Sequence, residues 1–508
     1  MKSKRQDILI LILFAIIPAV LLLFFSRNSF LYKINHREDI NAFLMAGQYI
    51  LNGKIPYRDF FDHKGPFVYY LYALCVAIVP GTFHGIYLLE VMCGFFDCLI
   101  ARKTIQLFVQ NKFTSFALTI AFYISSVLNE AGDSGEFEQL CLPLLLYAVY
   151  ITAKRIKTGE TILKRTYLLL GIFAGILFWS KYTILIVYIV CIVFLVSSFI
   201  QDKKYEEIKD LFLYGAIGIV IVSAIVLIFF ALNRSITDLI QVYFVTNLSN
   251  YSDSVTLYPG NKILSVSVAM LTGLIQYEFC FAYCLLIIFN TLSVKAASDL
   301  RLKRFVLLTF CGFASSLLMS SIGGFAFSYY FIIISSWYPL ILALFASQRK
   351  SLGKIPSRVC ITAFWTVYAF YMASYAIFFQ VSNINHNRYE AFQEKTIALI
   401  ERNGGEDIVS FNFMDEGFYH QMDVLPDRYY YITSSARHEE ILDSLHDEIV
   451  AGDVDYVVTK VWLNELDEDR NQILEEHMEG LHLEEVNSYV DTTWQEAFHV
   501  YRNLDADE

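Results

Sequence analysis

The sequence predicts a polytopic α-helical membrane protein that carries a small α/β domain at its C-terminal end. The chain of 508 residues is 56% hydrophobic and only 18% charged, with a mean hydropathy of +0.47, whereas soluble domains are about a quarter charged. Its apolar residues fall in long uninterrupted runs, which is typical of membrane-spanning helices. The charge is also divided very unevenly along the chain, which predicts two domains.

The charge division separates residues 1–380 from residues 381–508. The C-terminal part holds 30 Asp and Glu against 8 Lys and Arg, whereas the remainder holds 20 against 31. A tail this acidic is not expected to lie on anionic lipid. No soluble segment combines basic residues with interleaved aromatic ones, so nucleic acid is not an expected partner. The cysteines lie mostly inside apolar runs without metal-ligand spacing, which argues against a disulfide framework.

The N-terminal segment predicts a retained first helix. Residues 1–5 are basic, and residues 8–25 form an apolar run without a charge. This run is longer than the apolar core of a signal peptide, and no small-residue cleavage site follows it. We therefore expect the N-terminus in the cytoplasm.

Basic clusters between the apolar runs predict the topology. They lie within residues 154–165, 203–204, 295–304 and 349–358. Cytoplasmic loops are enriched in Lys and Arg, so we place all four clusters in the cytoplasm.

The apolar runs then follow in order. Two hairpins are expected, one over residues 167–200 that turns outside near Ser180 and Lys181, and one over residues 305–346 with its outer tip at residues 321–324. The other crossings are expected at 211–232, which leads to a second outer loop at 233–262, then one net crossing at 263–294 and a last crossing at 359–379.

One segment is too short for this scheme. Residues 67–79 are apolar but precede Pro80 and Gly81, and about 20 residues are needed for a span. We expect one crossing plus an interfacial piece over residues 67–101. The complete prediction is 11 to 13 helices in the cell membrane, with the N-terminus cytoplasmic and the C-terminal domain extracytoplasmic.

The tail alternates strand and helix patterns. Strands are expected at residues 407–413, 456–461 and 498–502, and amphipathic helices at 439–450 and 469–479. This order predicts a small α/β domain. The acidic run at residues 465–469 is interpreted as a solvated helix start rather than a metal site.

The first outer loop, residues 26–66, holds the residues best suited to chemistry. Asp39 precedes an amphipathic stretch at residues 40–51 that ends at Asn52 and Gly53, so an N-cap is the structural alternative for Asp39. The loop holds other ionisable residues close to the membrane, where a charged group is energetically costly unless it is paired or has a function. They are Glu38, Arg58, Asp59, Asp62, His63 and Lys64. A carboxylate here could take a proton from an acceptor hydroxyl, and a lysine could bind phosphate.

This loop resembles that of the GT-C glycosyltransferases, most closely family 39, which includes the protein O-mannosyltransferases and the lipid A aminoarabinose transferases. The matching residues are Asp39, Gly53, Tyr57, Asp59, Asp62, Lys64 and Pro66. The resemblance implies that Asp39 is the catalytic acidic residue, with Glu38 as the alternative. Lys64 matches the lysine of a K-P-P-like element in which Gly65 replaces the first proline.

Three later stretches also resemble this family. Glu136, with Asp133 and Glu138 beside it, matches an acidic residue before an apolar helix, and an exposed turn is the alternative. Lys181 follows Gly171 and Gly175 and is expected to contact phosphate, with snorkelling of the lysine and close packing of the glycines as alternatives. Tyr329 and Tyr330 match residues near the lipid-phosphate sugar, although Ser328 replaces the family histidine. Their alternative is the interfacial aromatic belt.

The resemblance implies transfer of a sugar from a polyprenyl-phosphate donor to a glycan, lipid or protein acceptor on the outer membrane face, with inversion. The expected substrate and phosphate contacts are Arg58, Asp59, Asp62, His63, Lys64, Glu136, Lys181, Tyr329 and Tyr330. Some members bind a divalent ion near this loop, which Asp62 and His63 could ligate here. No nucleotide-binding motif is present.

Two non-enzyme interpretations stay open from the sequence. One is a transporter or lipid flippase, for which Glu90 and Asp97 are buried candidates on a single helix, although no internal repeat accompanies them. The other is a membrane scaffold with a soluble outer domain. Convergence of Asp39, Lys64, Glu136 and Lys181 on one cavity would favour the enzyme.

Overall fold

The computed structural model describes residues 2–127, 135–249, 257–258, 260–276, 278–295, 300–347, 374, 377, 387–434, 436–464, 468–492 and 494–507. The chain forms two compact units. The helical unit comprises Met1–Leu31, Ile86–Phe229 and Val255–Tyr375. The mixed unit comprises Tyr32–Gly85, Phe230–Ser254 and Ala376–Glu508, so the first outer loop and the C-terminal residues fold together.

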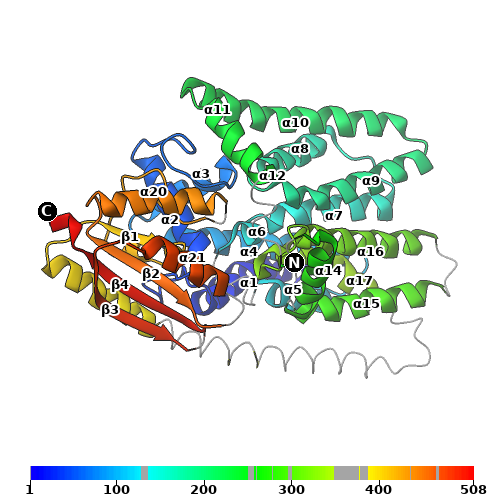
Figure 1. The fold of residues 1–508 in the computed structure, drawn as a ribbon. Coiled ribbons are helices and arrows are strands. Elements are labelled where there is room, and N and C mark those ends of the chain that lie inside the picture. The colour runs from blue at the N-terminus through cyan, green and yellow to red at the C-terminus, as the bar shows by residue number, and fades with distance from the viewer. Residues whose placement is uncertain are drawn as a thin grey trace. The chain divides into compact units, whose positions relative to one another are not determined.

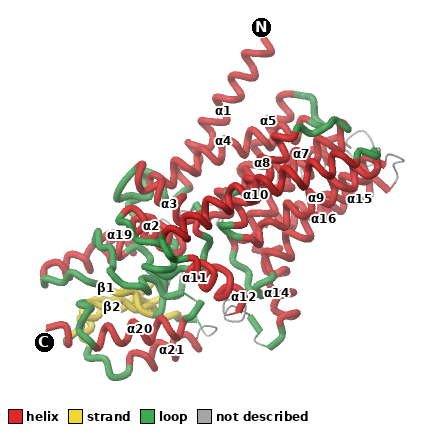
Figure 2. The backbone as a smooth tube through the Cα atoms, turned by 90° about the horizontal axis from the view of Figure 1, so that it is seen from above, coloured by secondary structure: helices red, strands yellow, loops and turns green. Residues whose placement is uncertain are grey.

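Most elements of the helical unit are helices that run side by side, as Figures 1 and 2 show for α7, α8, α9, α10 and α16. The elements are α1 (Lys2–Phe25), α4 (His84–Gln106), α5 (Lys112–Val127), α6 (Phe137–Leu140), α7 (Leu142–Thr158), α8 (Lys164–Phe178), η2 (Tyr182–Leu185), α9 (Ile186–Gln201), α10 (Tyr205–Leu232), α14 (Lys262–Gln276), α15 (Glu278–Lys295), α16 (Leu300–Ser321), η4 (Ser328–Trp337) and α17 (Tyr338–Ser347).

Six helical stretches within the described residues are long and apolar enough to cross a membrane. The bent pair Lys262–Ile275 and Cys280–Leu292, at 92°, raises this number to seven if it forms one span. The multi-pass architecture is therefore confirmed, but with fewer long spans than the 11 to 13 helices expected. One reason is that α5, α7 and α8 have only 16, 17 and 15 residues. The expected crossing at 359–379 lies almost entirely outside the described residues.

The turns of both predicted hairpins fall at the expected residues, since α16 ends at Ser321 and η4 begins at Ser328, whereas the side of the membrane that they face stays a prediction. Helix α8 ends at Phe178 and α9 begins at Ile186, with the turn near Ser180 and Lys181 between them. Both glycines of α8 lie directly against α10. A Cβ on Gly171 would lie 2.1 Å from the Gly215 carbonyl oxygen, and a Cβ on Gly175 would lie 2.9 Å from Val222 Cβ. Close helix packing accounts for both glycines.

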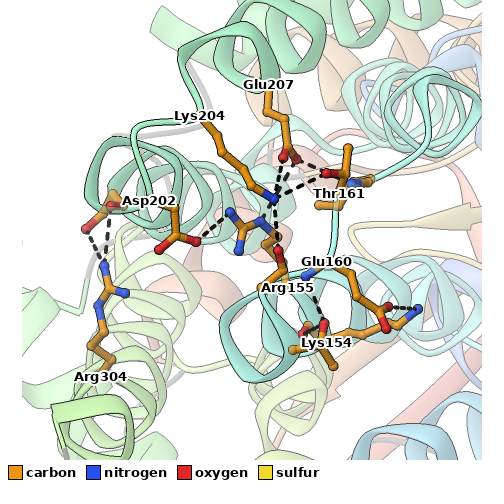
Figure 3. Close-up of polar contacts among 12 residues, drawn as sticks. Lys154, Arg155, Glu160, Thr161, Asp202, Lys204, Glu207 and Arg304 are labelled. Carbon is orange, nitrogen blue, oxygen red and sulfur yellow. Dashed lines mark hydrogen bonds and ion pairs between the residues drawn. The ribbon is translucent and has the colours of Figure 1, made fainter.

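Three of the four basic clusters meet at one end of the helical unit, as Figure 3 shows. Arg155 lies near the end of α7. Its Nη2 lies 2.8 Å from Asp202 Oδ2, and its Nε lies 3.9 Å from Glu207 Oε2. Lys204 donates to the Gly159 carbonyl at 3.0 Å, and Arg304 of α16 donates to the Ser197 carbonyl of α9 at 3.3 Å. This grouping is what the positive-inside assignment requires. The side of the membrane that this end faces stays a prediction.

The mixed unit contains α2 (Glu38–Leu51) of the first outer loop and α3 (Pro66–Ile78), which directly follows that loop. It also contains short elements of the second outer loop, α11 (Ile236–Leu239), the π-helical η3 (Ile240–Thr246) and α12 (Asn247–Ser249). Helices α2 and α3 pack so closely that a Cβ on Gly47 would lie only 2.9 Å from the Ala73 nitrogen. The 13 residues of α3 match the short apolar segment, and the longer α4 follows it.

The C-terminal residues form a four-stranded sheet with helices, as predicted (Figure 1). Its strands are β1 (Ile408–Phe411), β2 (Tyr456–Trp462), β3 (Leu483–Asp491) and β4 (Glu496–Asn503), in the order β1-β2-β4-β3. Its helices are residues 387–402, α19 (Phe418–Gln421), α20 (His438–Val450) and α21 (Glu468–Met478). Strand β2 pairs parallel with β1 and antiparallel with β4.

Strand β3, the helix over residues 387–402 and the short helix α19 are elements of this domain that the sequence pattern missed. Strand β3 lies at the sheet edge, its side chains are mostly exposed or half-buried, and a bulge occurs between Glu485 and Asn487. The helix packs on the sheet through Phe392, whose ring lies 5.4 Å from that of Tyr489. An edge strand with a bulge lacks the clean alternation that predicts strands.

Candidate active site

The first turn of α2 carries both candidate catalytic carboxylates. The helix begins at Glu38, and Arg37 occupies the N-cap position, where its side chain makes no capping hydrogen bond. The N-cap interpretation of Asp39 is therefore wrong, because this residue lies inside the helix. Two carboxylates in a first turn are stabilised by the positive end of the helix dipole. The helix ends at Asn52, followed by Gly53 at φ +83°, as predicted.

Asp39 and Lys64 form an ion pair. The Lys64 Nζ lies 3.8 Å from Asp39 Oδ1, and each side chain is 15% exposed. A pair so shielded interacts more strongly than one on an open surface. The structure thus brings together the carboxylate and the ammonium that were expected to act as base and phosphate partner.

The backbone of Lys64 is held by two tyrosines. Tyr57 and Tyr69 donate their hydroxyls to the Lys64 carbonyl, at 2.6 and 3.0 Å. Tyr57 is buried at φ +69°, a strained conformation for a bulky residue. Gly65 has φ −71° and ψ 148°, which lies within the range of proline. Replacement of the family proline by Gly65 therefore leaves a proline-like backbone.

Asp62 and His63 are buried next to this pair. The Asp62 carboxylate accepts the His63 backbone N–H at 2.6 Å. The His63 ring lies 3.3 Å from the Ser434 hydroxyl, and its carbonyl accepts Asn247 Nδ2 at 2.6 Å. Burial raises the pKa of Asp62 to about 6, with a further increase from Asp39 and an opposing effect of Lys64. These partners connect the site to both the second outer loop and the C-terminal domain.

Arg58 and Asp59 engage each other. Arg58 Nη2 lies 2.8 Å from Asp59 Oδ2, and Nη1 donates to the Asn233 carbonyl at 3.1 Å. The hydrogen bond from Arg58 holds the pKa of Asp59 below its usual value. Asp59 also accepts the Ile55 N–H at 2.6 Å, which closes the turn that leads to Tyr57.

Glu38 meets a lysine that sequence reasoning missed. Lys460 of β2 lies 3.5 Å from Glu38 Oε1, 2.7 Å from Glu416 Oε1 and 2.8 Å from Glu496 Oε1. No motif marks Lys460, which stands within an ordinary apolar strand pattern. Only the fold brings it to the first turn of α2.

A second group of expected site residues lies in the helical unit. Lys181 pairs with Glu138, and its Nζ lies 3.3 Å from the ring centroid of Tyr330 and 5.5 Å from that of Tyr329. Glu136 is buried at the N-cap position of α6. The structure therefore brings Lys181, Tyr329 and Tyr330 together, with Glu138 rather than Glu136 as the carboxylate partner. Asp133 lies outside the described residues.

Asp62 and His63 are the residues that the sequence suggests as ligands of a divalent ion. Within the described ranges, no group of three or more His, Cys, Asp or Glu side chains is arranged to hold a metal ion. The Nδ1 atom of His63 lies 3.5 Å from Oδ1 of Asp62.

Comparison with solved structures shows the class of the fold. The chain resembles ArnT from Cupriavidus metallidurans, in its structure bound to undecaprenyl phosphate, with a TM-score of 0.59 and 9% identity over 97% of this chain and 98% of that one. The apo structure of the same protein gives a TM-score of 0.58 and 10% identity, over 98% of each chain. The fold is that of the GT-C class.

Residues 63–229 match the model of the dolichyl-phosphate-mannose-protein mannosyltransferase family. No curated protein sequence gives a significant match to the chain. The family match over residues 63–229 and the GT-C fold together indicate a glycosyltransferase, which is the class that the sequence predicts.

Proposed function

We propose that the protein transfers a sugar from a polyprenyl-phosphate donor to an acceptor hydroxyl on the outer face of the membrane, with inversion and with Asp39 as the base. The observation that carries this proposal is the pairing of Asp39 with Lys64 in a shielded setting, at 3.8 Å. The class of donor is supported by the structural relative, whose structure contains undecaprenyl phosphate. The acceptor is a cell-envelope glycan, a lipid or a protein.

The proposed step is a single displacement. The Asp39 carboxylate accepts the proton of the acceptor hydroxyl while the hydroxyl oxygen bonds to the anomeric carbon. The bond from that carbon to the phosphate oxygen breaks, and the electron pair leaves with the polyprenyl phosphate. The Lys64 ammonium stabilises the charge that develops on the leaving phosphate. Attack from the face opposite the phosphate inverts the sugar.

Each remaining residue has a proposed part in binding. Asp62 and His63 fix the backbone that leads into Lys64, and Arg58 and Asp59 shape the preceding turn. In the helical unit, the Lys181 ammonium has the charge to bind phosphate, and the faces of Tyr329 and Tyr330 keep it in place. Glu138 pairs with this lysine, and we propose that Glu136 acts beside it in binding the donor.

The test uses the full chain in lipid nanodiscs with a panel of labelled polyprenyl-phosphate sugars and cell-envelope extracts as acceptors. We expect one donor to yield labelled product of inverted anomeric configuration, which NMR of the product resolves. Lys64→Met should lower kcat/KM by about 10²- to 10³-fold, as expected for loss of a group that stabilises transition-state charge.

The control is Asp427→Asn, which alters an exposed carboxylate of the same unit, paired with Lys54. It should leave turnover unchanged. Product of retained configuration would contradict the single displacement, and wild-type turnover in Lys64→Met would remove this lysine from the mechanism.

A further inference from the structure

Lys460 is the most heavily engaged charge of the C-terminal domain. Its side chain is only 5% exposed. The residue lies on β2, which is one of the two inner strands of the sheet. Its paired residue on β4 is Phe498, and directly paired residues share one face of a sheet. The ammonium lies 5.6 Å from the ring centroids of both Phe498 and Trp462. A lysine in such a place needs carboxylate partners, because an isolated buried charge is strongly unfavourable.

The partners exceed what one lysine requires. Three carboxylates, from Glu416, Glu496 and Glu38, lie within 3.5 Å of the Lys460 ammonium. Burial raises the pKa of Glu416 to about 8 and also raises that of Glu496. The nearby carboxylates in turn raise the pKa of Lys460, so the lysine stays cationic. One carboxylate would satisfy the lysine, so stability of the sheet does not by itself explain the third.

Glu38 differs from the other two carboxylates in its origin. Glu416 and Glu496 belong to the C-terminal domain itself, whereas Glu38 lies 422 residues before Lys460 and is the first residue of α2. Asp39 is the next residue. The same helix is tied to the C-terminal domain further along, since Tyr431 donates to the Ala42 carbonyl at 3.0 Å and Tyr49 donates to the Pro426 carbonyl.

The first turn of α2 thus has two acidic residues, each with its own lysine. Glu38 pairs with Lys460 and Asp39 pairs with Lys64. Successive residues of an α-helix are rotated by about 100° around its axis. The two ion pairs therefore hold the helix from different sides, so they set its rotation and with it the direction of the Asp39 carboxylate.

We propose that Lys460 is a positioning residue for the reaction: the C-terminal domain uses it to hold Glu38, and so aligns the neighbouring Asp39 with Lys64. This inference rests on the proposed function of Asp39. It gives the C-terminal domain a direct part in turnover, because the domain supplies a charge that orients the catalytic helix.

The test is a double-mutant cycle on turnover in the full-length protein. Lys460→Met keeps the length of the side chain but removes its charge, and Glu38→Gln removes the other half of the pair. Each should lower kcat by about tenfold to a hundredfold with the donor KM nearly unchanged, since a displacement of about 1 Å can cost on the order of 10²-fold in rate. The double variant should be no slower than the slower single variant, and Lys460→Arg should restore most of the turnover.

Glu416→Gln is the matched control. It removes the charge of one partner of Lys460 without altering a residue of α2. Turnover close to wild type is expected. If Glu416→Gln is as slow as Lys460→Met, or if the effects of Glu38→Gln and Lys460→Met simply multiply, the positioning role is refuted.

Two further outcomes separate this inference from the proposed function. Wild-type turnover in Lys460→Met and Glu38→Gln together with loss of turnover in Asp39→Asn would refute only the role of Lys460. Full turnover in Asp39→Asn with loss in Glu38→Gln would instead refute Asp39 as the base and make Glu38 the reacting carboxylate. Glu38 is 42% exposed, so Glu38→Gln should fold even if Lys460→Met does not.

Discussion

Replacement of Asp62 by asparagine is expected to stabilise the protein, but only at a pH where the carboxyl is ionised. Burial raises the pKa of Asp62 from 3.8 to about 6 in the folded state. A group with a raised folded pKa binds more protons when folded, so stability falls as pH rises between the two values. The difference of about two pKa units corresponds to roughly 3 kcal/mol of unfolding free energy.

Asparagine removes this cost and keeps an oxygen that accepts the His63 N–H. The stability gained by Asp62→Asn should be near zero at pH 4, grow up to pH 6 and level off at about 3 kcal/mol. For a unit of roughly 200 residues this is a rise in Tm of about 5–10 °C. Thermal unfolding in detergent, followed from pH 4 to pH 8, measures it independently of activity.

Asp59→Asn is the matched control, only three residues away. The pKa of Asp59 is lowered by Arg58, so its carboxylate stabilises the fold above its unfolded pKa, and this stability is lost as pH falls. Asp59→Asn should therefore destabilise at neutral pH and have little effect in acid. A gain for Asp62→Asn that is equal at pH 4 and pH 7, or a loss at pH 7, would refute the reasoning.

Three further predictions concern other parts of the molecule. Gly65→Pro should preserve turnover and raise the unfolding free energy by about 0.5–1 kcal/mol, because Gly65 already has a proline-like φ of −71°; a destabilised variant in thermal unfolding would contradict this. Gly171→Val should destabilise by about 1–3 kcal/mol or more, since a Cβ there meets the Gly215 carbonyl. Gly53→Ala, at a position without such a neighbour, should show only the strain of its positive φ. Tyr330→Leu should raise the donor KM several-fold and Tyr330→Phe should not, because the ring face holds Lys181 at 3.3 Å; equal KM values in the two variants would argue against that role.

The sequence was sufficient for the elements with a strong periodic or charge signal. The short helix at residues 66–78, the helix stop at Asn52 and the strands at β1, β2 and β4 all follow from hydrophobic pattern and turn chemistry. The edge strand β3 could not be predicted in this way, because its side chains are mostly exposed or half-buried and a bulge interrupts their alternation.

The candidate site was only partly predictable. Asp39 and Lys64 belong to one motif, and their pairing could be expected from the order of residues along the loop. Lys460 and Tyr69 could not, because neither belongs to a motif and both reach the site through folding. The choice of Glu138 as partner of Lys181 depends on the short helix α6, whose direction is not encoded in the local acidic pattern.

The central claim is that Asp39 acts in the chemical step rather than in binding. Its most direct test is the single-turnover rate of Asp39→Asn, measured together with the equilibrium affinity for the polyprenyl-phosphate donor. We expect a rate at least about 10²-fold below wild type, the usual contribution of a general base, with donor affinity changed by no more than a few-fold. A wild-type single-turnover rate in Asp39→Asn would contradict it.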